Sequence, residues 1–66
     1  MRVKVNGEIA ELESGMNLEQ VLKFYRLKME KVVVEHNRTV PTKNRYAEIF
    51  LKEGDEVEIV KFLGGG

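Results

Sequence analysis

The first residues of the chain alternate charged and apolar side chains. Residues 2–5 read RVKV, and this period of two predicts a strand with one buried face. Asn6-Gly7 follows, and Asn-Gly after an alternating segment is a strong signal for a two-residue hairpin turn. A second strand is expected to return over residues 8–13. We therefore predict that the chain opens with a β-hairpin.

Helical spacing replaces the alternation after residue 15. Asn17 is a good N-cap, and Gln20 three residues later completes a capping-box pattern. Apolar side chains then recur at three- and four-residue spacings, which is typical of a helix with one apolar face. They are Leu18, Val21, Leu22 and Tyr25. We expect this helix to pack on the sheet and to end near residues 26–28.

The second half of the chain contains short segments divided by turn signals. Val32–Val34 is a continuous β-branched run, which predicts a central strand buried on both faces and parallel to the first. Turns are expected at residues 37–38 and 53–55. A single helical turn is expected over residues 43–46, and another short strand over residues 47–51.

The last strand, expected over residues 56–62, changes character along its length. Its first half alternates valine and isoleucine with glutamate, giving one core face and one wet face. Val60 and Phe62 then fall on the face of the glutamates, next to Leu63. Exposed apolar patches tend to be functional, so these three residues are predicted to bind a partner. Phe62 as a cap over the end of the core is the alternative.

Three consecutive glycines, Gly64, Gly65 and Gly66, follow this strand. Fully extended, they would carry the terminal carboxylate roughly 10 Å beyond Leu63, and without Cβ atoms they can enter a narrow channel. We hypothesise that the Gly66 carboxylate is the reacting group. A frayed end without function is the alternative. The chain is accordingly divided into a domain of residues 1–63 and a flexible tail of residues 64–66.

Size and composition argue against a self-contained enzyme. A chain of 66 residues is one domain, and substrate pockets of about 300–1,000 Å³ need a larger scaffold. The sequence has no cysteine and one histidine, His36, which is expected to be structural or at the surface. Thiolate and two-histidine metal sites are therefore excluded. We expect no metal and no cofactor to be bound by this chain.

The charges balance, with 11 lysines and arginines against 11 aspartates and glutamates. Without a net positive field, neither nucleic acid nor an anionic membrane is an expected partner. A loose basic cluster at residues 23–31 is interpreted as a solvated helix end. The chain starts without a signal-peptide pattern and has no run of roughly 20 apolar residues, so a cytoplasmic location is expected.

Several short motifs occur in an order that resembles a known family. The matching motifs are Asn6-Gly7, Val33-Val34-Glu35-His36-Asn37, Val40-Pro41, Arg45-Tyr46, Gly54-Asp55, Glu58-Ile59-Val60 and the terminal Gly65-Gly66. Over essentially its whole length the chain is similar to the β-grasp sulfur carriers, and among them to the ThiS-like carriers of thiamine biosynthesis. The resemblance implies an α+β fold: a β-grasp (ubiquitin-like) roll with a mixed sheet of four to five strands and one main helix packed on one face.

The resemblance also implies a function in which this chain is a cosubstrate and not an enzyme. A ThiF-like adenylating enzyme would use ATP and magnesium to adenylate the carboxylate of Gly66. A sulfur donor such as a cysteine desulfurase system would then supply the sulfur that displaces AMP. The resulting Gly66 thiocarboxylate would donate sulfur to a ThiG-like thiazole synthase, which forms the thiazole ring of thiamine.

Three alternatives share the fold. A carrier of the molybdopterin-synthase small-subunit type often has proline before the tail, and residues 60–63 contain none. A ubiquitin-like modifier would join Gly66 to a lysine of another protein. A β-grasp interaction module would have a tail without function, so deletion of Gly65 and Gly66 would leave it active.

Overall fold

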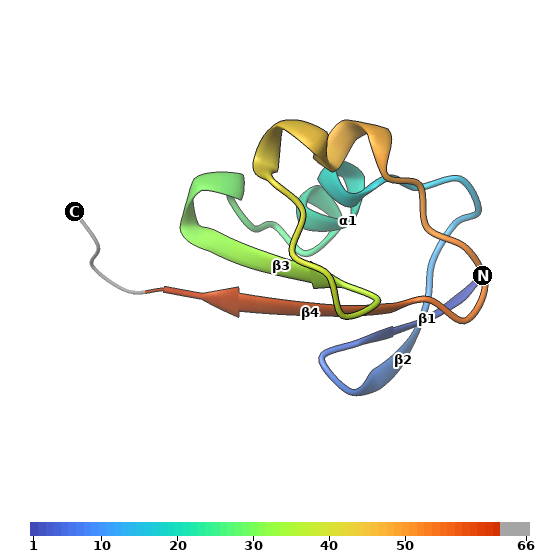
Figure 1. The fold of residues 1–66 in the computed structure, drawn as a ribbon. Coiled ribbons are helices and arrows are strands. Elements are labelled where there is room, and N and C mark those ends of the chain that lie inside the picture. Colours follow the sequence, from blue (N-terminus) through green and yellow to red (C-terminus); the bar gives the residue numbers. More distant parts are fainter. Residues whose placement is uncertain (63–66) are drawn as a thin grey trace.

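A four-stranded mixed sheet carries the fold in the computed structural model, which describes residues 1–62 (Figure 1). Its strands are β1 (Arg2–Val5), β2 (Glu8–Glu11), β3 (Val32–His36) and β4 (Glu56–Lys61), in the order β2-β1-β4-β3. The central pair, β1 and β4, is parallel, and each outer strand is antiparallel to its neighbour. Helix α1 (Leu18–Phe24) packs on one face of the sheet. This confirms the predicted α+β roll with one main helix.

Two of the predicted turns have the backbone angles of tight hairpin turns. Asn6 and Gly7 have φ values of 50° and 84°, and Asn37 and Arg38 have φ values of 48° and 71°. Positive φ at both central residues is the type I′ geometry, whose twist matches that of paired strands. The first turn is also tied to β4, because Asn6 Oδ1 accepts a hydrogen bond of 2.7 Å from the backbone N–H of Ile59.

The predicted capping box sets the start of α1. Asn17 Oδ1 accepts a 2.8 Å hydrogen bond from the backbone N–H of Gln20, and Gln20 Oε1 accepts one of 2.8 Å from that of Asn17. A helix of seven residues is too short to be stable in isolation. Its stability therefore comes from packing, with Leu18, Val21 and Leu22 buried against the sheet.

The strand containing Val32–Val34 is misplaced in the sequence-based prediction. The prediction that it is central, buried on both faces and parallel to the first strand is wrong: β3 lies at the sheet edge and runs antiparallel to β4. Val32 and Val34 are fully buried, but Val33 is 42% exposed on the other face. A β-branched run favours a strand whether one or both faces are covered, and here α1 covers only one.

The segment before β4 also differs from expectation. The predicted helical turn is a longer 3₁₀ helix, η2 (Lys43–Glu48), which places Tyr46 in the core. The strand predicted over residues 47–51 is absent, and only Phe50 forms an isolated bridge, to Asn17. A second short 3₁₀ helix, η1 (Met29–Lys31), leads into β3.

One hydrophobic core lies between the sheet and the helical segments. Its buried apolar side chains come from every strand except β2, from α1 and η2, and from the loops. They are Val3, Val5, Leu12, Leu18, Val21, Leu22, Val32, Val34, Tyr46, Leu51, Val57 and Ile59. Within residues 1–62, no helix covers the opposite face of the sheet (Figure 1).

Candidate functional site at the end of β4

The end of β4 is where the described chain leads into the predicted tail. Lys61 is the last residue of the strand and pairs with Val32. Beyond it, the backbone N–H of Phe62 donates a 3.2 Å hydrogen bond to the carbonyl of Lys31. The sheet and this bond therefore hold the backbone as far as Phe62. The predicted site residues Leu63, Gly64, Gly65 and Gly66 lie outside the described residues.

Exposed apolar side chains gather at this end of the β3–β4 pair. Val60 is 60% exposed and lies opposite Val33 on the face of the sheet without helices. Phe62 is 43% exposed, and the ammonium of Lys43 lies 5.5 Å from the centre of its ring. The prediction that Val60 and Phe62 are exposed at the end of the last strand is confirmed. We call Val33, Val60 and Phe62 the apolar patch.

Val33 belongs to this patch although the sequence-based analysis placed it inside the sheet. Its neighbours in the run are both apolar, so alternation gave no sign that it faces solvent. The signal that could have identified it is its partner, because cross-strand partners share a face. Val60 was already predicted to be exposed, and Val33 is its partner in the observed register.

Acidic side chains lie on the face of the sheet without helices, which we call the open face, further along the β3–β4 pair from Phe62. Glu35 lies opposite Glu58, and Glu56 lies 3.9 Å from the ammonium of Lys4. Like charges directly opposite each other in an antiparallel pair are destabilising. Folding alone therefore gives no reason to place two glutamates in register here.

A polar cluster around the buried carboxylate of Asp55 occupies the opposite end of the β3–β4 pair. Nε2 of His36 lies 3.0 Å from Oδ2 of Asp55. The same carboxylate accepts hydrogen bonds from the backbone N–H of Lys52, at 2.9 Å, and from Nδ2 of Asn37, at 3.2 Å. Asn37 Oδ1 in turn accepts from the backbone N–H of Glu56 at 2.8 Å. His36 is therefore structural, as predicted, and it helps to hold the start of β4.

The pKa of Asp55 reflects two opposing effects. Burial acts to raise it, because a charged carboxylate loses solvation. The hydrogen bonds from His36, Lys52 and Asn37 act in the opposite direction, and the net result is a pKa below the ordinary value of 3.8. The carboxylate is thus ionised at neutral pH and satisfied by its donors.

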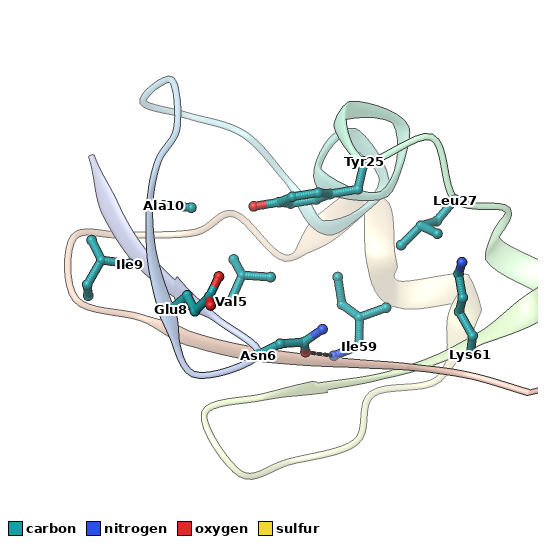
Figure 2. Close-up of a pocket in the computed structure, with 9 residues that line it drawn as sticks. All are labelled: Val5, Asn6, Glu8, Ile9, Ala10, Tyr25, Leu27, Ile59 and Lys61. Atoms are coloured by element: carbon teal, nitrogen blue, oxygen red, sulfur yellow. Dashed lines mark hydrogen bonds between the residues drawn. The ribbon is translucent and has the colours of Figure 1, made fainter.

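A groove of about 390 Å³ lies between the opening hairpin, the end of α1 and β4 (Figure 2). The ring of Tyr25 spans it from the α1 side towards Ala10, while Ile59 forms part of its floor. Lys61 stands at the end nearest the tail. The groove is a gap at the margin of the core, open to solvent, with mixed apolar and polar walls.

The described residues also limit other kinds of site. No helix within residues 1–62 is long and apolar enough to cross a membrane. Over the same residues, histidine, aspartate and glutamate nowhere gather in a group of three that could hold a metal ion.

Comparisons with known proteins agree with one another. A family model described as the ThiS family matches residues 3–66. The sulfur carrier protein ThiS of Bacillus subtilis is 41% identical over 65 residues, which make up 97% of this chain and 98% of that protein. A thiazole synthase of Magnetococcus marinus is 39% identical over 66 residues, and this chain spans only 20% of its length.

A solved structure supports the same assignment. The crystal structure of the thiamine biosynthesis protein (ThiS) from Geobacter metallireducens matches with a TM-score of 0.84 and 30% sequence identity, covering 100% of both chains. The family model, the sequence relatives and the solved structure therefore all indicate the same family. The chain belongs to the ThiS family, whose members have the ubiquitin-like β-grasp fold.

Proposed function

We propose that this chain is a sulfur carrier of thiamine biosynthesis whose reacting group is the terminal carboxylate of Gly66. The observation that carries the proposal is the match to the ThiS family, which extends through residue 66. The end of β4 supports it, because the sheet and the bond to Lys31 hold the backbone at Phe62. Four residues follow, three of them glycine, so the carboxylate would reach about 14 Å beyond that anchor when extended.

The proposed chemistry has two stages, one at a carboxylate oxygen of Gly66 and one at its acyl carbon. A ThiF-like enzyme joins the carboxylate of Gly66 to AMP, using ATP and magnesium and releasing pyrophosphate. A persulfide of the donor then attacks the acyl carbon and AMP leaves, and a thiol reductant cleaves the resulting acyl disulfide to leave the thiocarboxylate. Free sulfide would displace AMP and give the thiocarboxylate directly. The adenylate supplies the leaving group that a carboxylate lacks, while cations of the activating enzyme stabilise its phosphoryl charge.

This chain contributes the acyl group and its delivery. It has no cysteine, so sulfur is carried at the terminus and not on a side-chain thiol. Glycines at positions 64–66 allow the acyl carbon to enter a second protein's active site without side-chain collision. The apolar patch, which includes Val60 and Phe62, is proposed as the contact surface that positions the tail, together with Leu63.

A ThiG-like thiazole synthase is the proposed acceptor of the sulfur. The support is the thiazole synthase of Magnetococcus marinus, which contains a region 39% identical to the whole of this chain. A carrier-like region within a synthase is consistent with two activities that work on one intermediate. The sulfur donor is proposed by class only, as a cysteine desulfurase system.

The test is the intact mass of the protein before and after reaction. The starting mass must correspond to a chain ending at Gly66, because only then is its carboxylate free. After incubation with a ThiF-like enzyme, ATP, magnesium and a sulfide source, we expect the mass increase of one oxygen replaced by sulfur. The thiocarboxylate product should then support thiazole formation by a thiazole synthase.

Two variants serve as controls for the position of the carboxylate. Deletion of Gly66 and addition of one alanine after it both move the reacting carbon by one residue, roughly 3.5 Å. Neither variant should form an adenylate, although both should unfold at the wild-type temperature. Normal adenylation of the extended chain would contradict the mechanism, and a lysine-linked conjugate in cells would favour the protein-modifier function instead.

A further inference from the structure

A basic hollow lies beside the last described residue of the chain. Its volume is about 220 Å³, and the cationic residues Arg26, Lys28, Lys31 and Lys61 line it, with Phe62 at its edge. They come from three segments: the turn after α1, the approach to β3 through η1, and the end of β4. We use the name basic hollow for this cavity together with the four cationic residues that line it.

Backbone geometry brings these distant residues together. Arg26 has a φ of 59°, so α1 ends abruptly, and the backbone N–H of Leu27 bonds to the carbonyl of Leu22 at 2.8 Å. The chain then turns through η1 into β3. Because Val32 pairs with Lys61, a lysine from the other end of the sequence joins the cluster. The sequence alone showed only a loose run of basic residues near a helix end.

The four cations have no acidic partner in the part of the chain that the structure describes. The ion pairs found there use Arg2, Lys4, His36 and Arg45. Lys43 adds a fifth positive charge nearby, over the ring of Phe62. Gathering like charges does not stabilise the fold, so this arrangement calls for a counter-charge from outside.

We propose that the basic hollow docks acidic side chains at the mouth of the channel through which the activating enzyme receives the tail. This inference rests on the proposed function. The four cationic residues are exposed, and a hollow of about 220 Å³ is smaller than the roughly 300–1,000 Å³ typical of small-molecule sites. Exposed, hydrated cations on several segments suit a rim of carboxylates on a protein better than an enclosed phosphate.

The position of the hollow explains what the contact does. It adjoins Phe62, so at most about 14 Å of extended chain separates it from the carboxylate of Gly66. Charge pairing there orients the carrier as it approaches and holds the tail in line with the channel. Such pairing mainly raises the association rate and weakens with salt. Because the net charge of the whole chain is zero, this steering depends on where the charges lie.

The experiment compares two charge-reversal variants with equal net charge. Lys28→Glu/Lys61→Glu reverses two members of the hollow, whereas Arg38→Glu/Lys52→Glu reverses two exposed cations at the other end of the β3–β4 pair. Adenylation by a ThiF-like enzyme is measured as ATP–pyrophosphate exchange at about 0.1 M and about 1 M salt, between which the Debye length falls from about 10 to about 3 Å.

We expect kcat/KM of the hollow variant to fall at least tenfold at the lower salt, with kcat within about twofold of wild type. At the higher salt, kcat/KM of the hollow variant should be within threefold of wild type. The control variant should have kcat/KM within twofold of wild type at both salt concentrations. Thermal unfolding checks that both are folded, and Lys28→Gln/Lys61→Gln replaces the hollow variant if it is not.

Each other outcome is decisive. Equal losses in the two variants, with wild type active, would overturn the docking role of the hollow and leave the carrier function standing. A wild-type chain that no activating enzyme adenylates would overturn both. Titration of the free protein with inorganic phosphate, followed by NMR, tests the rival ligand: saturable shifts confined to the hollow at submillimolar phosphate would assign a small-anion site and reject the docking role.

Discussion

The two ends of the β3–β4 pair differ in whether their polar and apolar side chains make contacts within the molecule or face solvent. At the end where β4 begins, Asp55 is buried, and three donors on His36, Asn37 and Lys52 satisfy its carboxylate. At the end where β4 finishes, Phe62 is partly exposed and four cations surround a hollow. One end makes its contacts within the molecule, whereas the other leaves apolar and charged groups facing outward.

This difference separates stability from binding within one small sheet. In a chain of this size the core rarely supplies more than about 3–5 kcal/mol, and loss of the hydrogen bonds to a charged group typically costs about 1.5–3 kcal/mol. Exposed apolar and charged groups contribute little to folding. We call the end at Asp55 the locked end, because its hydrogen bonds hold the start of β4. We call the end at Phe62 the open end, because its exposed side chains can contact a partner.

The largest expected effect is the loss of the locked end. Asp55→Ala removes the ionised acceptor of three hydrogen bonds, so the free energy of unfolding should fall by about 1.5–3 kcal/mol. Urea unfolding measures it. The matched control is Glu56→Ala, which removes an exposed neighbouring carboxylate 3.9 Å from Lys4 and should cost less than about 1 kcal/mol. Equal effects would show that Asp55 does not lock this end.

A substitution at the open end should weaken binding to the activating enzyme with little effect on the stability of the fold. Phe62→Asp should weaken binding to a ThiF-like enzyme at least about tenfold, or about 1.4 kcal/mol, and lower the free energy of unfolding by less than about 1 kcal/mol. Calorimetric titration and thermal unfolding measure the two effects. Phe50→Asp is the control, since Phe50 is exposed but lies in another segment. A large fall in the melting temperature of Phe62→Asp would place Phe62 in the core.

Acid should weaken the locked end through the same carboxylate. The native pKa of Asp55 is below its ordinary value of 3.8, so the native state favours the ionised form. Its contribution to stability is complete well above that value and is lost as the pH falls through it towards the native pKa. Urea unfolding from pH 7 to pH 3 should show a smaller decline for Asp55→Asn than for wild type. Parallel declines would mean that other groups cause the acid sensitivity.

The smallest expected effect concerns the glutamate pair between the two ends. Glu58→Lys places a cation opposite Glu35 and should raise the free energy of unfolding by about 0.5 kcal/mol. Glu56→Lys is its mirror control, because it faces Lys4 and should lower stability by a similar amount. If Glu58→Lys is destabilising, the open face has a folding role that the register does not reveal.

Local patterns predicted most of the elements of this fold. The hairpin turn at Asn6-Gly7, the capping box at Asn17 and the alternation in the last strand depend on interactions between near neighbours. Each of these was confirmed. The exposed position of Val60 was also predictable, because alternation assigns every second residue to one face, and Phe62 is exposed as predicted. The site residues beyond Phe62 stay predictions.

Long-range pairing was not predictable. Nothing near Val33 indicates that β4 lies between β1 and β3, and this order alone puts β3 at the edge. Residues 47–51 were predicted to form a strand, but their backbone forms hydrogen bonds with the start of α1. The N–H of Leu18 donates to the carbonyl of Ile49 at 3.0 Å, and the N–H of Leu51 donates to the carbonyl of Met16 at 2.9 Å. β-propensity depends on the neighbours that a segment meets.

The sequence by itself determined the turn at Asn6-Gly7, the capping box that starts α1, and the alternation that exposes Val60 in β4. These properties come from contacts a few residues apart. Only the tertiary structure decided that His36 and Asn37 meet Asp55, and that Lys61 joins Arg26, Lys28 and Lys31 beside Phe62. Both clusters unite residues far apart in the chain, and strand pairing, which no local pattern encodes, brings them together.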